Sequence, residues 1–476
     1  MRRLVQFLVA AMVVSLLTPA LAFGGSRMHV GFHDDPNFRF EENRGASLDQ
    51  ARDANATIVR TLVTWASVAP KRPRNAANPF DPAYRFDDLD ELVRNSQQRG
   101  LEVLLTVWGT PKWANGGKKP NILPKRNADF ANFMRALASR YSGRHAGYPF
   151  VRFYSVWNES NLQLFLSPQF DSKGRSVGPK LYAKLYAAGY AGVKRGNARA
   201  KVAIGETSTH GRDKDVKGLS DTHSPGRFAQ LVAQANPRLK FDAWAHHPYP
   251  TPQYLKPTQK VKWPNVSLSS LPRFERSLDM WFKRKGSNKV KIWITEYGHE
   301  TKPDGEKKGI TRAKQAAYAL QAFNIARKDA RVDMFVWFVL RDHPTSEWQS
   351  GLITKAGRPK PALARFRAAA KLVDIRNAIV SMRGGNGAPM VTVPLREYGA
   401  GTAAGEPVGV NFRVFEKGTL VANGQASAPF GSDATIRVRL SGFAPVRKRT
   451  YTVELEANVF SGGGVKLART FTLLTT

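Results

Sequence analysis

Short apolar runs alternate with amphipathic stretches along most of the chain. Eight apolar runs have the length of β-strands, and they lie at residues 29–33, 57–65, 101–108, 151–157, 201–206, 241–246, 290–295 and 332–340. Helical spacing of apolar residues predicts a helix after each run, at 47–54, 86–100, 128–141, 181–195, 225–235, 270–285, 311–328 and 361–374. Nearly continuous apolar strands bounded by helices indicate a parallel sheet buried on both faces. Eight such units predict closure into an α/β fold of the (β/α)₈ TIM-barrel type, rather than an open, doubly wound sheet.

The pattern changes beyond about Val380. Residues 383–389 (RGGNGAP) are typical of a linker, and short alternating strands without a helical period follow at 391–393, 408–415, 435–440, 450–457 and 465–473. We therefore expect a barrel domain over residues 23–380 and a small β-sandwich over 381–476. The sandwich has few aromatic residues, which favours a structural or surface-attaching role over specific sugar binding.

The first 22 residues have the features of a secretory signal peptide. Arg2 and Arg3 precede an apolar run at 4–17, and the small-residue pattern Ala20-Leu21-Ala22 follows it. The run is too short to span a membrane as a helix. We expect cleavage after Ala22 and an exported protein without stable membrane insertion, although a retained N-terminal anchor is an alternative.

Charge and cysteine content restrict the possible partners. The sequence has no cysteine, so neither disulfides nor thiolate metal sites are available. It has 73 Lys and Arg residues against 37 Asp and Glu, a formal net charge of +36, which attracts polyanions such as acidic cell-wall polymers or nucleic acid. The basic residues are spread along the chain without an isolated basic arm. We therefore favour a dispersed basic surface and expect no specific nucleic-acid binding.

A glutamate lies just beyond the end of two of the predicted strands. The run VRFYSVWNES at 151–160 leads to Asn158 and Glu159, and VKIWITEYG at 290–298 leads to Glu296. Active sites of (β/α)₈ barrels lie at the carboxyl ends of the strands. The alternative is that each glutamate caps a loop or pairs with a nearby cation. Two strand-end carboxylates are, however, what a retaining glycosidase needs, one ionised to attack the anomeric carbon and one protonated to release the leaving oxygen.

The residues around these glutamates give each a different expected environment. Strand alternation would place Ser155 and Trp157 on one face of the strand and Tyr154 and Asn158 on the other. Arg60, inside an apolar strand, would favour the charged form of one carboxylate. The aromatic residues before Glu159 would desolvate the other, so the two pKa values would separate.

Two motifs carry a resemblance to a known group of enzymes. WNE at 157–159 and ITEYG at 294–298 resemble the acid/base and nucleophile signatures of the clan A retaining glycoside hydrolases, such as the family five cellulases and family thirty-nine β-xylosidases. The resemblance covers roughly residues 28–375. It is supported by Arg60, by HPY at 247–249 and by Trp337 in the last predicted strand.

The resemblance implies roles for individual residues. Glu159 would be the acid/base and Glu296 the nucleophile, while Asn158 would bind the sugar 2-hydroxyl and Tyr249 would hydrogen-bond the nucleophile. His247 and Trp337 would also line the substrate site. One departure is the region after the third strand, WGTPKW at 108–113, where cellulase-like members often have a histidine.

Several further residues have more than one interpretation. Trp65, Trp108, Trp113 and Trp348 could stack on sugar rings, and core packing is the alternative for each. A metal site is a rival use of His246, His247, His299 and Glu206, but neither HxH nor HExxH occurs, so we expect no metal and no cofactor.

The sequence as a whole predicts an exported retaining β-glycoside hydrolase that acts on a polysaccharide or oligosaccharide by double displacement. A catalytically silent barrel that binds wall polysaccharide is the alternative, and hydrolysis of an aryl β-glycoside would distinguish the two.

Overall fold

The computed structural model describes residues 28–252, 254–302, 309–344, 348–374, 379–381, 389–394, 407–429, 435–446, 449–459 and 466–474. The predicted signal peptide at 1–22 and all but the last residue of the predicted linker lie outside these ranges. In the described part, no helix is both long enough and apolar enough to cross a membrane.

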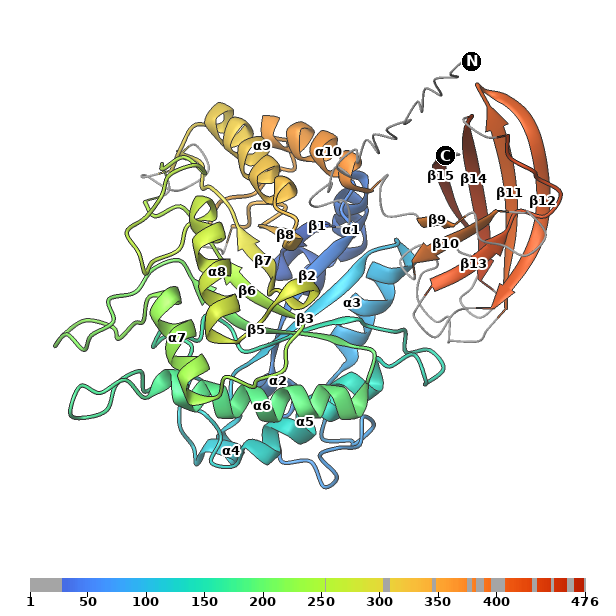
Figure 1. Cartoon of the computed structure of the whole chain (residues 1–476). Helices are drawn as coiled ribbons and strands as arrows, with labels where there is room; N and C mark the ends of the chain where they lie inside the picture. The colour runs from blue at the N-terminus through green and yellow to red at the C-terminus, as the bar shows by residue number, and fades with distance from the viewer. Residues whose placement is uncertain are drawn as a thin grey trace, which may run out of the picture.

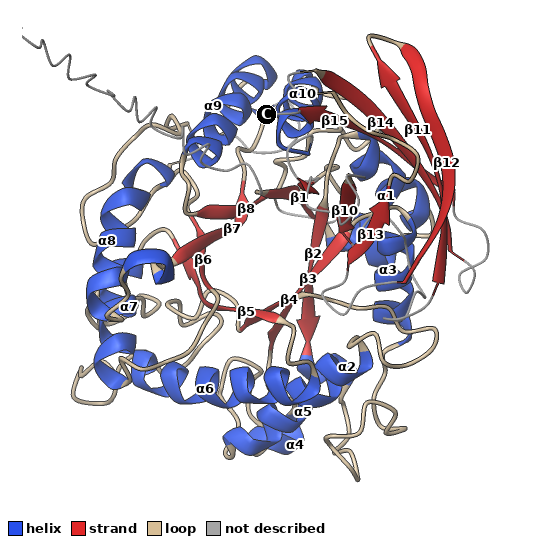
Figure 2. Cartoon of the chain, turned by 45° about the vertical axis from the view of Figure 1, so that its right-hand side comes forward, coloured by secondary structure: helices blue, strands red, loops and turns tan. Residues whose placement is uncertain are grey.

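Eight parallel strands close into a barrel in sequence order, as predicted (Figure 2). The ring is completed by pairing of the last strand with the first. The strands are β1 (His29–His33), β2 (Ile58–Thr64), β3 (Glu102–Trp108), β4 (Phe153–Val156), β5 (Lys201–Ser208), β6 (Ala243–His247), β7 (Lys291–Tyr297) and β8 (Val332–Phe338).

A principal helix follows each strand and covers the outside of the ring (Figure 1). These helices are α1 (Arg44–Asp53), α3 (Asp87–Gln98), α5 (Asn127–Arg140), α6 (Gly178–Gly196), α7 (Pro225–Ala235), α8 (Leu271–Trp281), α9 (Arg312–Lys328) and α10 (Pro361–Asp374). Shorter helical segments lie in the connections, and they are η1 (Pro36–Phe40), α2 (Trp65–Val68), α4 (Lys112–Asn115), η2 (Leu268–Ser270) and η3 (Gly286–Asn288). Helix α7 begins where the sequence indicates, because the Ser224 hydroxyl accepts from the Arg227 amide and Pro225 fits the first turn.

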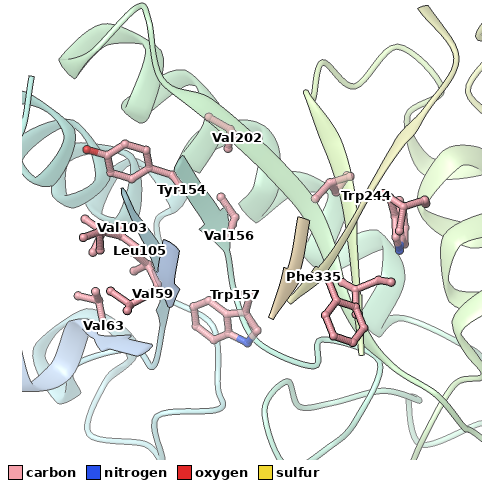
Figure 3. Close-up of a cluster of buried hydrophobic side chains, with 14 of the residues drawn as sticks. Val59, Val63, Val103, Leu105, Tyr154, Val156, Trp157, Val202, Trp244 and Phe335 are labelled. Atoms are coloured by element: carbon pink, nitrogen blue, oxygen red, sulfur yellow. The ribbon is translucent and has the colours of Figure 1, made fainter. Parts of the chain in front are cut away.

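Strand alternation divides the apolar side chains into two layers. The inner layer fills the barrel and consists of Ile58, Leu104, Phe153, Ala203, Ala243, Ala245, Trp293, Met334 and Val336. The outer layer packs against the helices, and Figure 3 shows part of it, including Val59, Leu105, Tyr154 and Phe335. Both faces of the sheet are buried, which explains why the strands are nearly continuous apolar runs.

Alternation breaks at the end of β4, which corrects one expectation from the sequence. Trp157 has a φ of 71°, and its ring lies 6.0 Å from that of Phe130 of α5, in the outer layer. Asn158 turns inward and contacts Arg60. Trp157 and Asn158 therefore exchange the faces that a regular strand would give them.

The C-terminal strands form two antiparallel sheets that lie apart from the barrel (Figure 1). One sheet has the order β13 (Thr435–Arg439), β10 (Met390–Pro394), β9 (Ile379–Ser381), and the other has the order β12 (Thr419–Pro429), β11 (Pro407–Glu416), β14 (Thr450–Val459), β15 (Lys466–Leu474). This arrangement agrees with the predicted sandwich. The sequence did not predict β12, whose small and polar residues give little alternation, although the turn at Lys417 and Gly418 has the two positive φ angles of a tight hairpin.

Candidate active site

The carboxyl ends of five strands bring a group of polar side chains together at one end of the barrel. These side chains come from β2, β4, β5, β6 and β7 or the residues directly after them, and they are Arg60, Asn158, Glu159, Glu206, His247, Tyr249 and Glu296. This is the end at which (β/α)₈ barrels bind their substrates.

Arg60 is the centre of the group and is fully buried. Its Nη1 donates to Glu296 Oε1 at 2.6 Å, and its Nη2 donates to Asn158 Oδ1 at 2.9 Å and to Glu206 Oε2 at 3.2 Å. Its Nε donates to the Thr106 hydroxyl of β3 at 2.9 Å. The guanidinium therefore fixes side chains from four other strands relative to one another.

Glu296 is surrounded by cations and hydrogen-bond donors. Besides the bond from Arg60, the Tyr249 hydroxyl donates to Oε2 at 3.0 Å, and His247 Nδ1 lies 3.6 Å from the same oxygen. Burial alone would raise the pKa of Glu296, but the positive charges of His247 and Arg60 outweigh it and hold the pKa well below its usual range. Glu296 is therefore a carboxylate over the working pH range of most enzymes.

Glu159 has a different environment. It follows β4 with a φ of 32°, and its side chain is 16% exposed. Its Oε1 lies 3.1 Å from His247 Nδ1. One carboxylate oxygen each from Glu159 and Glu296, together with a His247 ring nitrogen, lie within 4.8 Å of one another. The two glutamates therefore face the same small space.

His247 connects three carboxylates. Its Nε2 lies 2.7 Å from Glu206 Oε2, and its Nδ1 faces Glu159 and Glu296. Burial favours the neutral ring, but the charge of Glu296 and the hydrogen bonds to Glu159 and Glu206 raise the pKa of His247 to about 9. The ring is an imidazolium near neutral pH, with both nitrogens as donors.

Glu206 is the member of the site whose role the sequence did not reveal. It lies on a bulge of β5, where Gly205 has a φ of 101° and Glu206 a φ of 45°, and the register with β6 shifts between Gly205 and Thr207. The bulge turns the carboxylate into the barrel. The signal that could have found it is the same as for the other two glutamates, since the apolar run at 201–206 also ends in a glutamate.

Two tryptophans do not line the site, contrary to the prediction. Trp65 begins α2 and is fully buried, with its ring stacked 5.6 Å from that of Phe133. Trp337 belongs to the outer layer of β8, and its Nε1 donates to the Ser350 carbonyl at 2.9 Å. Both side chains point away from the barrel interior, because each lies at an outward position of its strand or strand end.

The aromatic ring at the mouth of the barrel is instead Phe338, the last residue of β8. It lies at an inward position and is half-buried, with its ring 5.0 Å from that of His33 and 6.5 Å from that of Tyr249. Trp348, also half-buried, lies 5.1 Å from the Tyr249 ring and 6.3 Å from Phe338. These rings form an aromatic wall beside Glu296.

Trp108 is the last residue of β3. It is half-buried, packs 5.3 Å from Phe165, and lines an open hollow of ≈420 Å³ together with Asn121 and Gln163. Trp113 instead packs on Trp65 and under the guanidinium of Arg72. Of the four tryptophans, Trp348 therefore lies beside Tyr249 of the site, and Trp108 lines this open hollow.

The residues considered as a rival metal site, His246, His247, His299 and Glu206, do not form one group of ligands. His246 faces the outer layer, where its Nε2 meets the Val266 carbonyl, and burial lowers its pKa to about 3. Among the described residues, the one group spaced to hold an ion is Glu159, His247 and Glu296. Arg60, Tyr249 and Glu206 already bond to its oxygen and nitrogen atoms, so this donor set does not fit a resident metal.

A family model described as "Cellulase (glycosyl hydrolase family 5)" matches residues 23–161, a range that contains Arg60, Asn158 and Glu159. A search of the curated proteins gives no match.

Solved structures share the fold at low identity. A family 39 glycoside hydrolase from Bacteroides cellulosilyticus WH2 is 18% identical, with a TM-score of 0.52, over 88% of this chain and 80% of that one. A glucosidase from Croceicoccus marinus is 14% identical, with a TM-score of 0.54, over 91% and 95% of the two chains. The GH5_18 protein from Streptomyces cattleya, solved with GlcNAc, is 16% identical, with a TM-score of 0.51, over 73% and 80%. These likenesses show the shared fold, and with the family match over residues 23–161 they bear out the predicted resemblance to the clan A glycoside hydrolases.

Proposed function

We propose that this protein is an exported retaining β-glycosidase in which Glu296 is the nucleophile and Glu159 the acid/base. The observation that carries this proposal is that one carboxylate oxygen of Glu159 and one of Glu296 lie within 4.8 Å of each other. Retaining enzymes hold their carboxyl groups about 5–5.5 Å apart, whereas inverting enzymes leave about 6.5–9.5 Å for a water molecule.

In the first step, a Glu296 oxygen attacks the anomeric carbon while the bond from that carbon to the leaving oxygen breaks. Glu159 gives its proton to the leaving oxygen and becomes a carboxylate. The products are a glycosyl ester on Glu296 and a released alcohol or sugar. Arg60 and Tyr249, which hydrogen-bond Glu296, keep the nucleophile ionised and oriented for this attack.

In the second step, Glu159 takes a proton from water as the water oxygen bonds to the anomeric carbon. The ester bond breaks and Glu296 is again a carboxylate. Each displacement inverts the configuration, so the product retains the configuration of the substrate.

Asn158 and the aromatic side chains support substrate binding in this scheme. Arg60 donates to Asn158 Oδ1, which leaves the Asn158 NH₂ group to donate to a sugar hydroxyl, such as the 2-hydroxyl. Phe338 and Trp348, which pack against Tyr249 beside Glu296, offer apolar ring faces, and such faces pack well against pyranose rings.

The test is hydrolysis of aryl β-glycosides, with the configuration of the first-formed product followed by NMR. We expect the β-anomer first. A 2-deoxy-2-fluoro glycoside should label Glu296, as found by peptide mass spectrometry. A label on Glu206 or Glu300, or an α-anomer as the first product, would contradict the assignment.

We further propose that the positive charge holds the exported protein near anionic polymers such as acidic wall material. A hollow of ≈480 Å³ at the opposite end of the barrel supports this proposal, because five of its lining side chains are cationic: Arg238, Lys240, Lys283, Arg284 and Lys285. The nearby carboxylates of Asp242 and Asp279 are already paired with Lys194 and Arg331. Binding to insoluble acidic wall material should weaken steeply as salt rises, because screening acts within about 10 Å at 0.1 M. Binding that does not change with salt would point to specific sugar contacts.

A further inference from the structure

The site holds one carboxylate that the two-step reaction does not use. Glu206 is fully buried, and its Oε2 accepts from His247 Nε2 at 2.7 Å, from the Thr295 hydroxyl at 2.7 Å and from Arg60 Nη2 at 3.2 Å. A buried carboxylate is costly unless cations and donors compensate it. The bulge of β5 therefore places Glu206 where His247, Thr295 and Arg60 compensate its buried charge.

The main partner of Glu206 is His247, which lies between it and the two proposed catalytic glutamates. While Nε2 points to Glu206, Nδ1 lies 3.1 Å from Glu159 Oε1 and 3.6 Å from Glu296 Oε2. One N–H of the ring therefore faces both of the carboxylates that change charge during the proposed reaction.

We propose that Glu206 is a positioning residue that keeps His247 protonated, so that His247 serves as a shared counter-ion for Glu296 and Glu159 in turn. This inference deepens the proposed glycosidase function and rests on it for the reaction steps. The protonation of His247 itself can be tested without turnover.

The charges at each stage of the reaction support this role. Before reaction, the cations Arg60 and His247 balance the anions Glu206 and Glu296, while Glu159 is protonated. After the first step, Glu296 is a neutral ester and Glu159 has lost its proton, so the same two cations balance Glu206 and Glu159. The negative charge moves between two carboxylates that both lie beside His247 Nδ1, so the summed charge of these five side chains does not change.

Glu206 is suited to hold the proton on His247 because its own charge does not change during the cycle. Burial would raise the pKa of Glu206, but the charge of Arg60 and the hydrogen bond from His247 outweigh it and lower the pKa. Glu296 loses its charge in the ester, and Glu159 is neutral before the first step. Of the three carboxylates that face His247, Glu206 is the one that is an anion throughout.

Other groups around His247 change this balance little. Arg60 opposes protonation but is neutralised by its bonds to Glu206 and Glu296. His246 is turned to the outer layer and is neutral, since burial lowers its pKa to about 3. The Tyr249 hydroxyl, whose pKa burial and Glu296 raise, donates to Glu296 and stays neutral.

The first experiment follows the His247 ring by ¹³C and ¹⁵N NMR as a function of pH, with its signal assigned by its absence from the His247→Gln spectrum. In the wild-type protein we expect the imidazolium at pH 7 and titration near pH 9. A neutral ring at pH 7 would overturn the proposal, whether or not the protein hydrolyses a glycoside.

The second experiment removes the charge of Glu206 while keeping its shape. In Glu206→Gln we expect the pKa of His247 to fall by about 1 to 3 units. Glu206→Asp, which keeps the charge, should restore much of this loss. Glu275→Gln, at another buried glutamate, in α8, is the matched control and should leave the His247 titration unchanged. An unchanged His247 titration in Glu206→Gln would refute the role of Glu206.

The third experiment tests the shared counter-ion. With Glu296 esterified by a 2-deoxy-2-fluoro glycoside, His247 should still be protonated at pH 7, because Glu159 now carries the charge.

The alkaline limb of the kcat/KM profile should also move to lower pH in Glu206→Gln, whereas a purely structural role would lower the whole profile without moving its limb. Loss of the His247 proton in the trapped wild-type protein would contradict the shared role, and absence of any labelling would count against the glycosidase function instead.

Discussion

The ends of β4 and β7 are built from the same kind of sequence, an apolar run that ends in a glutamate, yet they form different environments. At the end of β7, Glu296 receives hydrogen bonds from Arg60 and Tyr249 and lies close to His33 and His247. At the end of β4, Glu159 is more exposed and meets His247 alone among the described cationic groups. The glutamate and its strand position predict a reactive site, whereas the partners from other strands hold the pKa of Glu296 well below its usual range.

Arg60 contacts both strand ends, but in different ways. Arg60 bonds Glu296 directly, but it reaches the β4 end through the neutral amide of Asn158. The cation therefore stabilises a negative charge on Glu296 more strongly than one on Glu159. A proton on Glu159 and a charge on Glu296 are the two states that double displacement requires.

Removal of the carboxylate at the β7 end should have the largest effect. We expect Glu296→Ala to lower kcat on aryl β-glycosides by about 10⁴-fold or more, because no other group can form the covalent intermediate. Added azide should replace the nucleophile and yield the α-glycosyl azide, which NMR identifies. Near-normal activity in Glu296→Ala would show that Glu296 is not the nucleophile.

Removal of the carboxylate at the β4 end should cost less and should depend on the leaving group. General acid–base catalysis contributes about 10²–10⁴-fold, and a good aryl leaving group needs little proton donation. Glu159→Ala should therefore lose more activity on substrates with poor leaving groups, as steady-state kinetics over an aryl series will show. Azide should attack the intermediate and give the β-glycosyl azide, whereas an α-azide would assign Glu159 to the other role.

Much of this arrangement follows from local sequence patterns, and the rest depends on contacts between distant segments. The eight strands, their helices and the positions of Glu159 and Glu296 are predictable because burial on both faces and strand ends leave local signals. The inward turn of Asn158 is not, since it depends on the positive φ of Trp157. Nor is the role of Glu206, because its bulge and its bond to His247 join residues from two strands.

The end of β8 shows the same limit and gives a smaller test. Trp337 and Phe338 are neighbours, but Trp337 packs in the outer layer and Phe338 faces the site. We expect Phe338→Ala to lower kcat/KM by about 10- to 100-fold with little change in the free energy of unfolding. Trp337→Ala should instead cost about 3–5 kcal/mol of stability, measured by denaturant unfolding, because it leaves a cavity in the core. A raised KM with normal stability in Trp337→Ala would restore the original prediction for that residue.

The smallest effect should come from removal of the C-terminal sheets, since none of their described residues is among the side chains at either strand end. Every side chain assigned to the site lies between His33 in β1 and Trp348, and α10, which ends at Asp374, completes the outer layer of the barrel. A chain ended near Gly384 should therefore hydrolyse a small aryl β-glycoside at a rate within about twofold of the full chain, since the carboxylates act at contact distance in a partly buried site. Circular dichroism and thermal unfolding would verify that the shortened chain is folded. A folded, inactive product would show that the sandwich completes the site, and the contrast between Glu159 and Glu296 would then involve groups beyond the barrel.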